Sequence, residues 1–116
     1  MEQKKFNFSR GARCVVFEFL LKELNLMNSS DLRKNIKDLL EENNFPDTVF
    51  NLGNVEFVDS TGIGTMIAFY NTLKANGKKM FVVGVSKRVQ QIFNLAKLDK
   101  MLAILPTMED ALKQLG

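Results

Sequence analysis

The segment from Val55 to Gly64 leads an apolar strand directly into a helix. Its second half supplies capping side chains and two glycines, residue types that favour a tight strand-to-helix turn, in the string Asp59-Ser60-Thr61-Gly62-Ile63-Gly64. From here to the C-terminus, predicted strands and helices alternate with short connections. That alternation implies parallel strands joined by crossover helices, which places the chain in the α/β class.

The other apolar runs of the chain are short and separated by polar segments. Together with the first, they predict strands at Phe6–Phe8, Cys14–Leu21, Thr48–Leu52, Val55–Val58, Met80–Val85 and Leu102–Leu105. The first two strands are expected to form an antiparallel hairpin, and the nearly unbroken apolar run of Met80–Val85 indicates burial on both faces. We therefore expect one α/β domain with a mixed, mostly parallel sheet of four to five strands packed by about four helices.

Capping residues mark where the helices begin. Asn28 is the expected N-cap of the first helix, and Asp31 then lies near the positive end of its dipole. Ser86 and Thr107 are expected to cap the last two helices in the same way. In the helix that follows the glycines, five apolar residues are expected to share one face: Ile63, Met66, Ile67, Tyr70 and Leu73.

The composition excludes the commonest catalytic and metal-binding arrangements. The 116 residues include no histidine, which removes Ser-His-Asp triads, Cys-His pairs and histidine metal sites. The single cysteine, Cys14, cannot form a thiolate zinc site, and its apolar surroundings favour a buried structural thiol. We therefore expect no catalytic residues, no metal and no cofactor, in a protein that is not an enzyme.

The charge pattern gives little support to a nucleic-acid-binding role. The net charge is +3, but the basic residues are scattered, and neither an arginine-rich run nor an RNA-recognition aromatic motif accompanies them. No apolar run approaches the roughly 20 residues that span a bilayer, and the polar start Met1–Lys5 is unlike a signal peptide. We expect a cytoplasmic protein that contacts neither nucleic acid nor membrane directly.

The string from Asp59 to Gly64 has two interpretations. Taken alone it is an ordinary cap and turn, because Asp, Ser and Thr are favoured at N-caps. Placed after a strand, it resembles the phosphorylation-site signature of bacterial anti-sigma factor antagonists, small proteins of the STAS domain family. A further family landmark, Gly-Glu-Leu-Asp, reads Lys22-Glu23-Leu24-Asn25 here, with its first and last positions changed. The resemblance covers nearly the whole chain and implies a single STAS domain over residues 1–116.

The resemblance also implies roles for individual residues. Ser60 corresponds to the phosphoacceptor, and Thr61 is a neighbouring hydroxyl that could take its place. Asp59 would orient the docked loop, the two glycines would permit close backbone approach, and the loop from Asn25 to Asn28 would flank the site. The implied partner-binding residues are Asn25, Asn28, Asp59, Ser60, Thr61, Gly62, Ile63 and Gly64.

The partners are likewise implied by the resemblance. Proteins of this kind, when unphosphorylated, bind an anti-sigma factor that is also a serine kinase of the histidine-kinase-like ATPase fold. Binding frees the sigma factor, phosphorylation by the same kinase ends the complex, and a metal-dependent serine phosphatase restores the active form. The chain would be the substrate rather than the catalyst, in keeping with the lack of a GxxxxGK[ST] nucleotide-binding loop. A monomer is the simplest expectation for its oligomeric state.

Three alternatives remain open from the sequence. The chain could be a STAS module that regulates a sensory complex or a membrane transporter. Asp59 could accept a phosphoryl group as in a two-component receiver, although the paired acidic residues that hold Mg²⁺ in such domains do not follow the early strands. Binding to nucleic acid through the net positive charge would show a steep dependence on salt.

Overall fold

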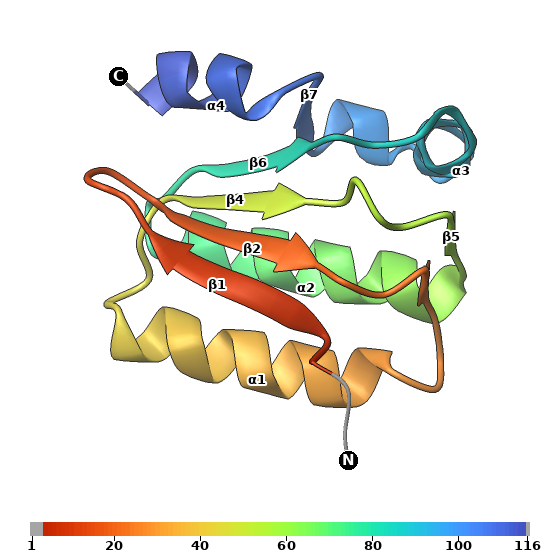
Figure 1. Cartoon of the computed structure of the whole chain (residues 1–116), viewed down its shortest axis with the longest axis horizontal. Coiled ribbons are helices and arrows are strands. Elements are labelled where there is room, and N and C mark those ends of the chain that lie inside the picture. Colours follow the sequence, from red (N-terminus) through yellow and green to blue (C-terminus); the bar gives the residue numbers. More distant parts are fainter. Residues whose placement is uncertain (1–3, 116) are drawn as a thin grey trace.

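Five strands pair into one sheet in the computed structural model, which describes residues 4–115 (Figure 1). The order is β1-β2-β4-β6-β7, with bounds Phe6–Arg10, Val15–Phe19, Thr48–Asn51, Met80–Val83 and Ala103–Leu105. β1 pairs antiparallel with β2, and the remaining neighbours pair in parallel. The expected mixed, mostly parallel sheet is therefore confirmed. Residues 1–3, part of the polar start of the sequence, lie outside the described residues.

Helices cover both faces of this sheet, as is usual where crossover helices join parallel strands. The four α-helices are α1 (Ser29–Glu42), α2 (Ser60–Ala75), α3 (Lys87–Leu95) and α4 (Met108–Leu115), and a 3-10 turn spans Leu98–Lys100. Figure 1 shows α1 and α2 side by side on one face and α4 on the other. Each of the last two helices begins at its predicted cap, since Ser86 Oγ accepts from Val89 N and Thr107 Oγ1 from Asp110 N.

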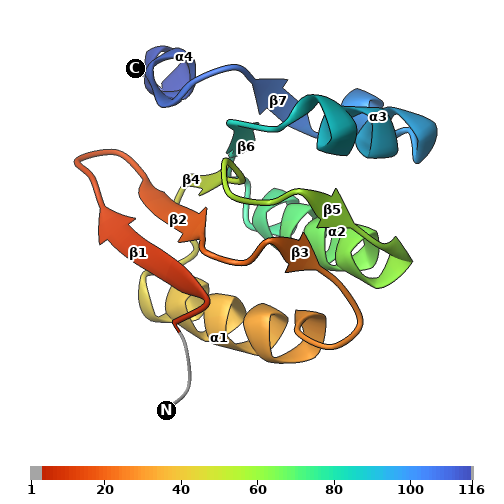
Figure 2. The same cartoon turned by 45° about the vertical axis from the view of Figure 1, so that its right-hand side comes forward.

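Two short strands form a separate parallel pair at one end of the molecule (Figure 2). They are β3 (Glu23–Leu24) and β5 (Phe57–Val58), and β5 is shorter than the predicted Val55–Val58 strand. The pairing continues past β5, because Asp59 N donates to Leu24 O at 3.0 Å. A strand of two residues is too short to show an alternating pattern, so β3 was not predicted. The pairing of β3 with β5 places the loop after β3 beside the start of α2.

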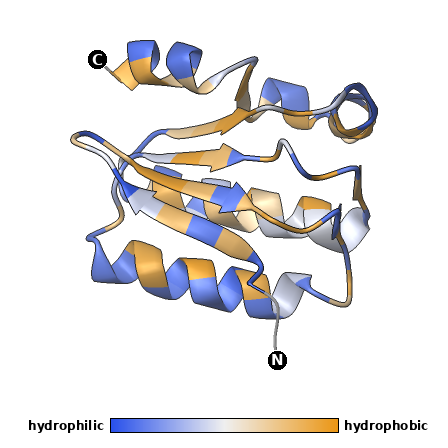
Figure 3. Cartoon of the chain, in the orientation of Figure 1, coloured by the Kyte–Doolittle hydropathy of each residue, from blue (hydrophilic) through white to orange (hydrophobic). Residues whose placement is uncertain are grey.

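The main core lies between the sheet and the pair α1 and α2. Phe50 on β4 stacks on Phe17 of β2 and on Phe69 of α2, with ring centroids 5.5 and 5.1 Å apart. The predicted face of α2 was partly wrong, because it omitted Phe69. The helix buries Gly62, Thr65, Met66, Phe69 and Leu73, whereas Ile63, Ile67 and Tyr70 are only half-buried. In Figure 3, α1 alternates between hydrophobic and hydrophilic residues, whereas α2 carries apolar residues on several sides. The spacing of apolar residues in α2 therefore does not identify a single buried face.

A second, smaller core lies beneath α4. It contains Cys14, Val49, Phe81, Val83 and Ala111. All four residues of β6 are buried, which confirms that this strand is covered on both faces. Burial raises the pKa of the Cys14 thiol, and the nearby negative charge of Asp47 adds to this effect. A raised thiol pKa disfavours the reactive thiolate, as expected for a structural cysteine.

Candidate functional site

Ser60 is the first residue of α2 and its side chain is exposed. It follows Asp59, the N-cap, whose Oδ1 accepts a hydrogen bond from Gly62 N at 2.9 Å. The backbone carbonyl of Asp59 accepts from Ile63 N at 2.9 Å and so begins the helical ladder. The ordinary capping role of this string is therefore confirmed. It leaves the serine hydroxyl at the positive end of a sixteen-residue helix.

The second carboxylate oxygen of Asp59 reaches a different part of the chain. Asp59 Oδ2 accepts from Leu26 N at 3.0 Å, so one side chain joins the start of α2 to the loop after β3. The N–H of Gly62 lowers the pKa of Asp59 most strongly, burial opposes the shift, and the N–H groups of Leu26 and Thr61 add to the lowering. The carboxylate is therefore ionised at neutral pH and held by two backbone donors.

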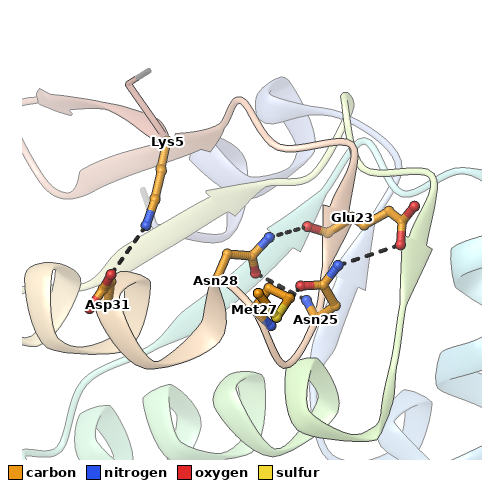
Figure 4. Close-up of polar contacts among 6 residues, drawn as sticks. All are labelled: Lys5, Glu23, Asn25, Met27, Asn28 and Asp31. Atoms are coloured by element: carbon orange, nitrogen blue, oxygen red, sulfur yellow. Dashed lines mark hydrogen bonds and ion pairs between the residues drawn. The ribbon is translucent and has the colours of Figure 1, made fainter. Parts of the chain in front are cut away.

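Two asparagines shape the loop that Asp59 holds (Figure 4). Asn28 Oδ1 accepts from Asn25 N at 3.0 Å, and Asn28 Nδ2 donates to Glu23 O at 2.8 Å. Asn25 Oδ1 accepts in turn from Met27 N at 3.0 Å. Asn28 does occupy the N-cap position of α1, but its side chain makes no capping hydrogen bond. The prediction of a side-chain cap was wrong because the amide is already bound to the loop.

The two glycines of the string have different surroundings. A Cβ added to Gly62 would lie 2.5 Å from Leu24 O and 2.8 Å from a Val58 methyl, distances that no real contact shows. The close backbone approach at Gly62 is thus made within the chain, between α2 and β3. A Cβ added to Gly64 would meet nothing within 4 Å, and this residue is exposed. No contact within the described chain therefore requires a glycine at position 64.

The predicted site residues lie close together at one end of the molecule. The β5–α2 turn contributes Asp59 to Gly64, and the hydrogen bond to Leu26 brings the Asn25–Asn28 loop beside it. Ser60 and Gly64 are exposed, Gly62 is buried, and the others are half-buried. Their roles in binding a partner remain predictions.

Sequence reasoning named the loop but missed its two most exposed residues, Leu26 and Met27. Both are large and apolar, and they stand between two asparagines in a segment where solvent-facing polar residues are usual. This contrast between two apolar residues and their polar neighbours could have identified the pair from the sequence.

Within residues 4–115, no three side chains of the His, Cys, Asp or Glu type gather as a metal site would require. No helix in that range combines the length and apolar character needed to cross a bilayer.

Comparison with known proteins gives the chain a family. The model of the STAS domain matches residues 11–111. An anti-sigma-B factor antagonist of Staphylococcus epidermidis is 28% identical over 82 residues, which cover 71% of this chain and 75% of that protein.

Solved structures share the fold over nearly the whole chain. An anti-sigma factor antagonist from Mycobacterium paratuberculosis matches with a TM-score of 0.82 at 23% identity, over 95% of this chain and 92% of that one. The Bacillus cell fate determinant SpoIIAA in its phosphorylated form matches with a TM-score of 0.71 at 20% identity, over 96% of this chain and 99% of that one.

Proposed function

This chain belongs to the STAS domain family, and we propose that it acts as an anti-sigma factor antagonist. In the proposed cycle, the unphosphorylated form binds an anti-sigma factor that is also a serine kinase, and the sigma factor is released. Phosphorylation by that kinase ends the complex, and a serine phosphatase restores the binding form. The observation that carries the proposal is an exposed serine at a helix N-terminus, directly after a cap that is tied to a second loop.

Ser60 is the proposed phosphoacceptor. Its side chain is exposed, whereas that of Thr61 is half-buried on the next position of the helix. A kinase must reach the hydroxyl with the terminal phosphate of ATP, so accessibility favours Ser60. Asp59 is less suited to accept the phosphoryl group itself, as the aspartate of a receiver domain does. Both of its carboxylate oxygens already accept backbone hydrogen bonds.

Phosphorylation would change the surface of the protein without unfolding it. A phosphoserine carries roughly −1.5 to −2 charges at pH 7, and the backbone N–H groups and dipole at a helix N-terminus favour an anion. The neighbouring Asp59 carboxylate opposes this stabilisation by repulsion. At an interface, an unpaired buried charge costs about 2–5 kcal/mol, which lowers affinity by tens to thousands of fold. The phosphate therefore acts on the complex rather than on the fold.

The names of the relatives support the partner assignment. The Staphylococcus relative is an anti-sigma-B factor antagonist, and one structural neighbour was solved in a phosphorylated form. We extend both properties to this chain as part of the proposal. In that scheme the chain is a cytoplasmic substrate and binding protein, and the catalysts are the kinase and the phosphatase.

The proposal is tested by locating the phosphate. The wild-type protein is used as bait in a lysate of the source organism, and the ATPase-type kinase that it retains is purified. This kinase is incubated with ATP and each of three substrates: wild type, Ser60→Ala and Thr61→Val. Phosphopeptide mass spectrometry is expected to find the wild type and Thr61→Val modified and Ser60→Ala unmodified. Full modification of Ser60→Ala would contradict the assignment.

The same capture experiment distinguishes this function from a second use of the fold. A STAS module that regulates a transporter or a sensory complex would retain membrane or receptor proteins instead of a soluble kinase. Fractionation of the captured proteins into membrane and soluble pools separates these outcomes.

A further inference from the structure

Two large apolar side chains of the loop that Asp59 holds are mostly exposed to solvent. Leu26 is 70% exposed and Met27 is 88% exposed, at adjacent positions of the loop between β3 and α1. A single exposed apolar residue needs no explanation, but an adjacent pair beside a candidate docking surface does. Displaying both to water has no benefit for the isolated fold.

The loop that displays them is rigidly built. The two asparagines on either side direct their side-chain atoms inward, to Asn25 N, Met27 N and Glu23 O, at 2.8–3.0 Å (Figure 4). Asn25 O also accepts from Ser29 N at 2.9 Å, which joins the loop to the start of α1. A surface that is ordered before binding loses less conformational entropy on association. The polar residues shape the loop, and the apolar residues between them remain available for contact.

The loop is also continuous with the proposed phosphorylation site. Leu26 N lies 3.0 Å from Asp59 Oδ2, and Asp59 immediately precedes Ser60. Any kinase that brings ATP to the Ser60 hydroxyl must cover the surface around Asp59. It therefore reaches the residues that this carboxylate holds in place.

We propose that Leu26 and Met27 are the apolar anchor by which this chain binds its kinase, inserting into an apolar pocket of that protein beside the Ser60 contact. The inference rests on the proposed function and adds what the partner must offer. Asn25 and Asn28 then act as positioning residues for the anchor. A few residues that fill well-packed, desolvated pockets near the centre of an interface commonly dominate its affinity.

The test measures affinity with the anchor removed. The kinase retained by the wild-type bait is purified and titrated with unphosphorylated protein in ADP, which supplies no phosphoryl group for Ser60. The variant carrying Leu26→Ser and Met27→Ser is expected to bind at least about thirtyfold more weakly, the loss typical of an interface hot spot. Met27→Leu preserves the apolar contact and is expected to bind within a few fold of wild type.

A matched control removes an exposed apolar residue elsewhere. Leu112 is 51% exposed on α4, which lies on the opposite face of the sheet from α1 and α2 (Figure 1). Leu112→Ser is expected to bind like wild type. Urea unfolding of each variant separates weak binding from loss of fold, and a folded double variant that binds within about threefold of wild type overturns the inference. A wild type that retains no ATPase-type kinase overturns the proposed function and the anchor with it.

Discussion

Among single residues, Asp59 is the one whose side chain joins two separate parts of the site. One oxygen caps α2 through Gly62 N, and the other holds the β3–α1 loop through Leu26 N. A carboxylate can do both because each oxygen accepts independently. The same side chain therefore joins the start of α2, where Ser60 lies, to the exposed loop, which is the geometry that a docking partner would meet.

Replacing Asp59 by Asn is expected to lower the stability of the fold near neutral pH. Asn has one acceptor oxygen, so it can cap α2 or hold Leu26 N, and its NH₂ group faces a donor at the other position. The pKa of Asp59 is lowered from its ordinary value of 3.8 on folding, so its ionised form stabilises the native state. This contribution is complete above that value and is lost as pH falls through the lower, folded pKa.

The measurement is the urea unfolding midpoint of wild type and Asp59→Asn as a function of pH. The gap between the two proteins should be largest near pH 7 and should narrow below about pH 4. Asp38→Asn, an exposed carboxylate in α1, is the control and should show no such gap. A gap that is constant from neutral to acidic pH would contradict the role assigned to the ionised carboxylate.

The residues of the site were predictable to different degrees. The string from Asp59 to Gly64 has a local signature, so its cap, turn and exposed serine follow from the sequence. Asn28 was predicted in the right position with the wrong bond, because several acceptors and donors compete for one amide and only the folded loop decides among them. The exposure of Leu26 and Met27 depends on what surrounds the loop in space.

Among the helices and strands, α2 can pack closely against β3 because Gly62 has no side chain. Gly62 is buried against Leu24 and Val58, and the pairing of β3 with β5 depends on this contact distance. β3 was not predictable from two residues, and the buried face of α2 was ambiguous since apolar residues surround much of the helix. The capped helices and the longer strands, whose patterns are local, were predicted well.

Gly62→Ala is expected to destabilise the protein by about 1–3 kcal/mol or more, because the new Cβ forces backbone rather than a flexible side chain to move. Gly64→Ala is the matched control in the same helix. Its Cβ meets nothing within 4 Å, and alanine favours the helix by about 0.5–1 kcal/mol over glycine. Urea unfolding should therefore move the two midpoints in opposite directions. Equal effects would contradict the packing described for Gly62.

Within the whole molecule, the exposed Ser60 lies at the surface, outside the two cores. The start of α2, whose first residue is Ser60, lies at the end of the sheet toward which β2 and β4 point (Figure 1), a usual place for function in α/β proteins. The larger core is formed by the sheet with α1, α2 and α3, and the smaller core by the sheet with α4. Charge at Ser60 can therefore change without disturbing either core.

Ser60→Glu is expected to leave the free energy of unfolding within about 0.5 kcal/mol of wild type, as for most exposed substitutions. The helix dipole favours the new charge and Asp59 opposes it, so the two effects partly cancel. Amide chemical-shift changes should be confined to the start of α2 and the β3–α1 loop. Shifts spread through the buried strands would contradict a switch that acts only on the surface.

In the proposed cycle, the charge state of Ser60 controls binding to a soluble kinase. The most direct test titrates the purified kinase, in ADP, with wild type and with the Ser60→Glu variant, after both have been shown to be folded. We predict that the wild type binds and that Ser60→Glu binds at least tens of fold more weakly. Equal affinity of the two folded proteins would show that charge at Ser60 does not control binding.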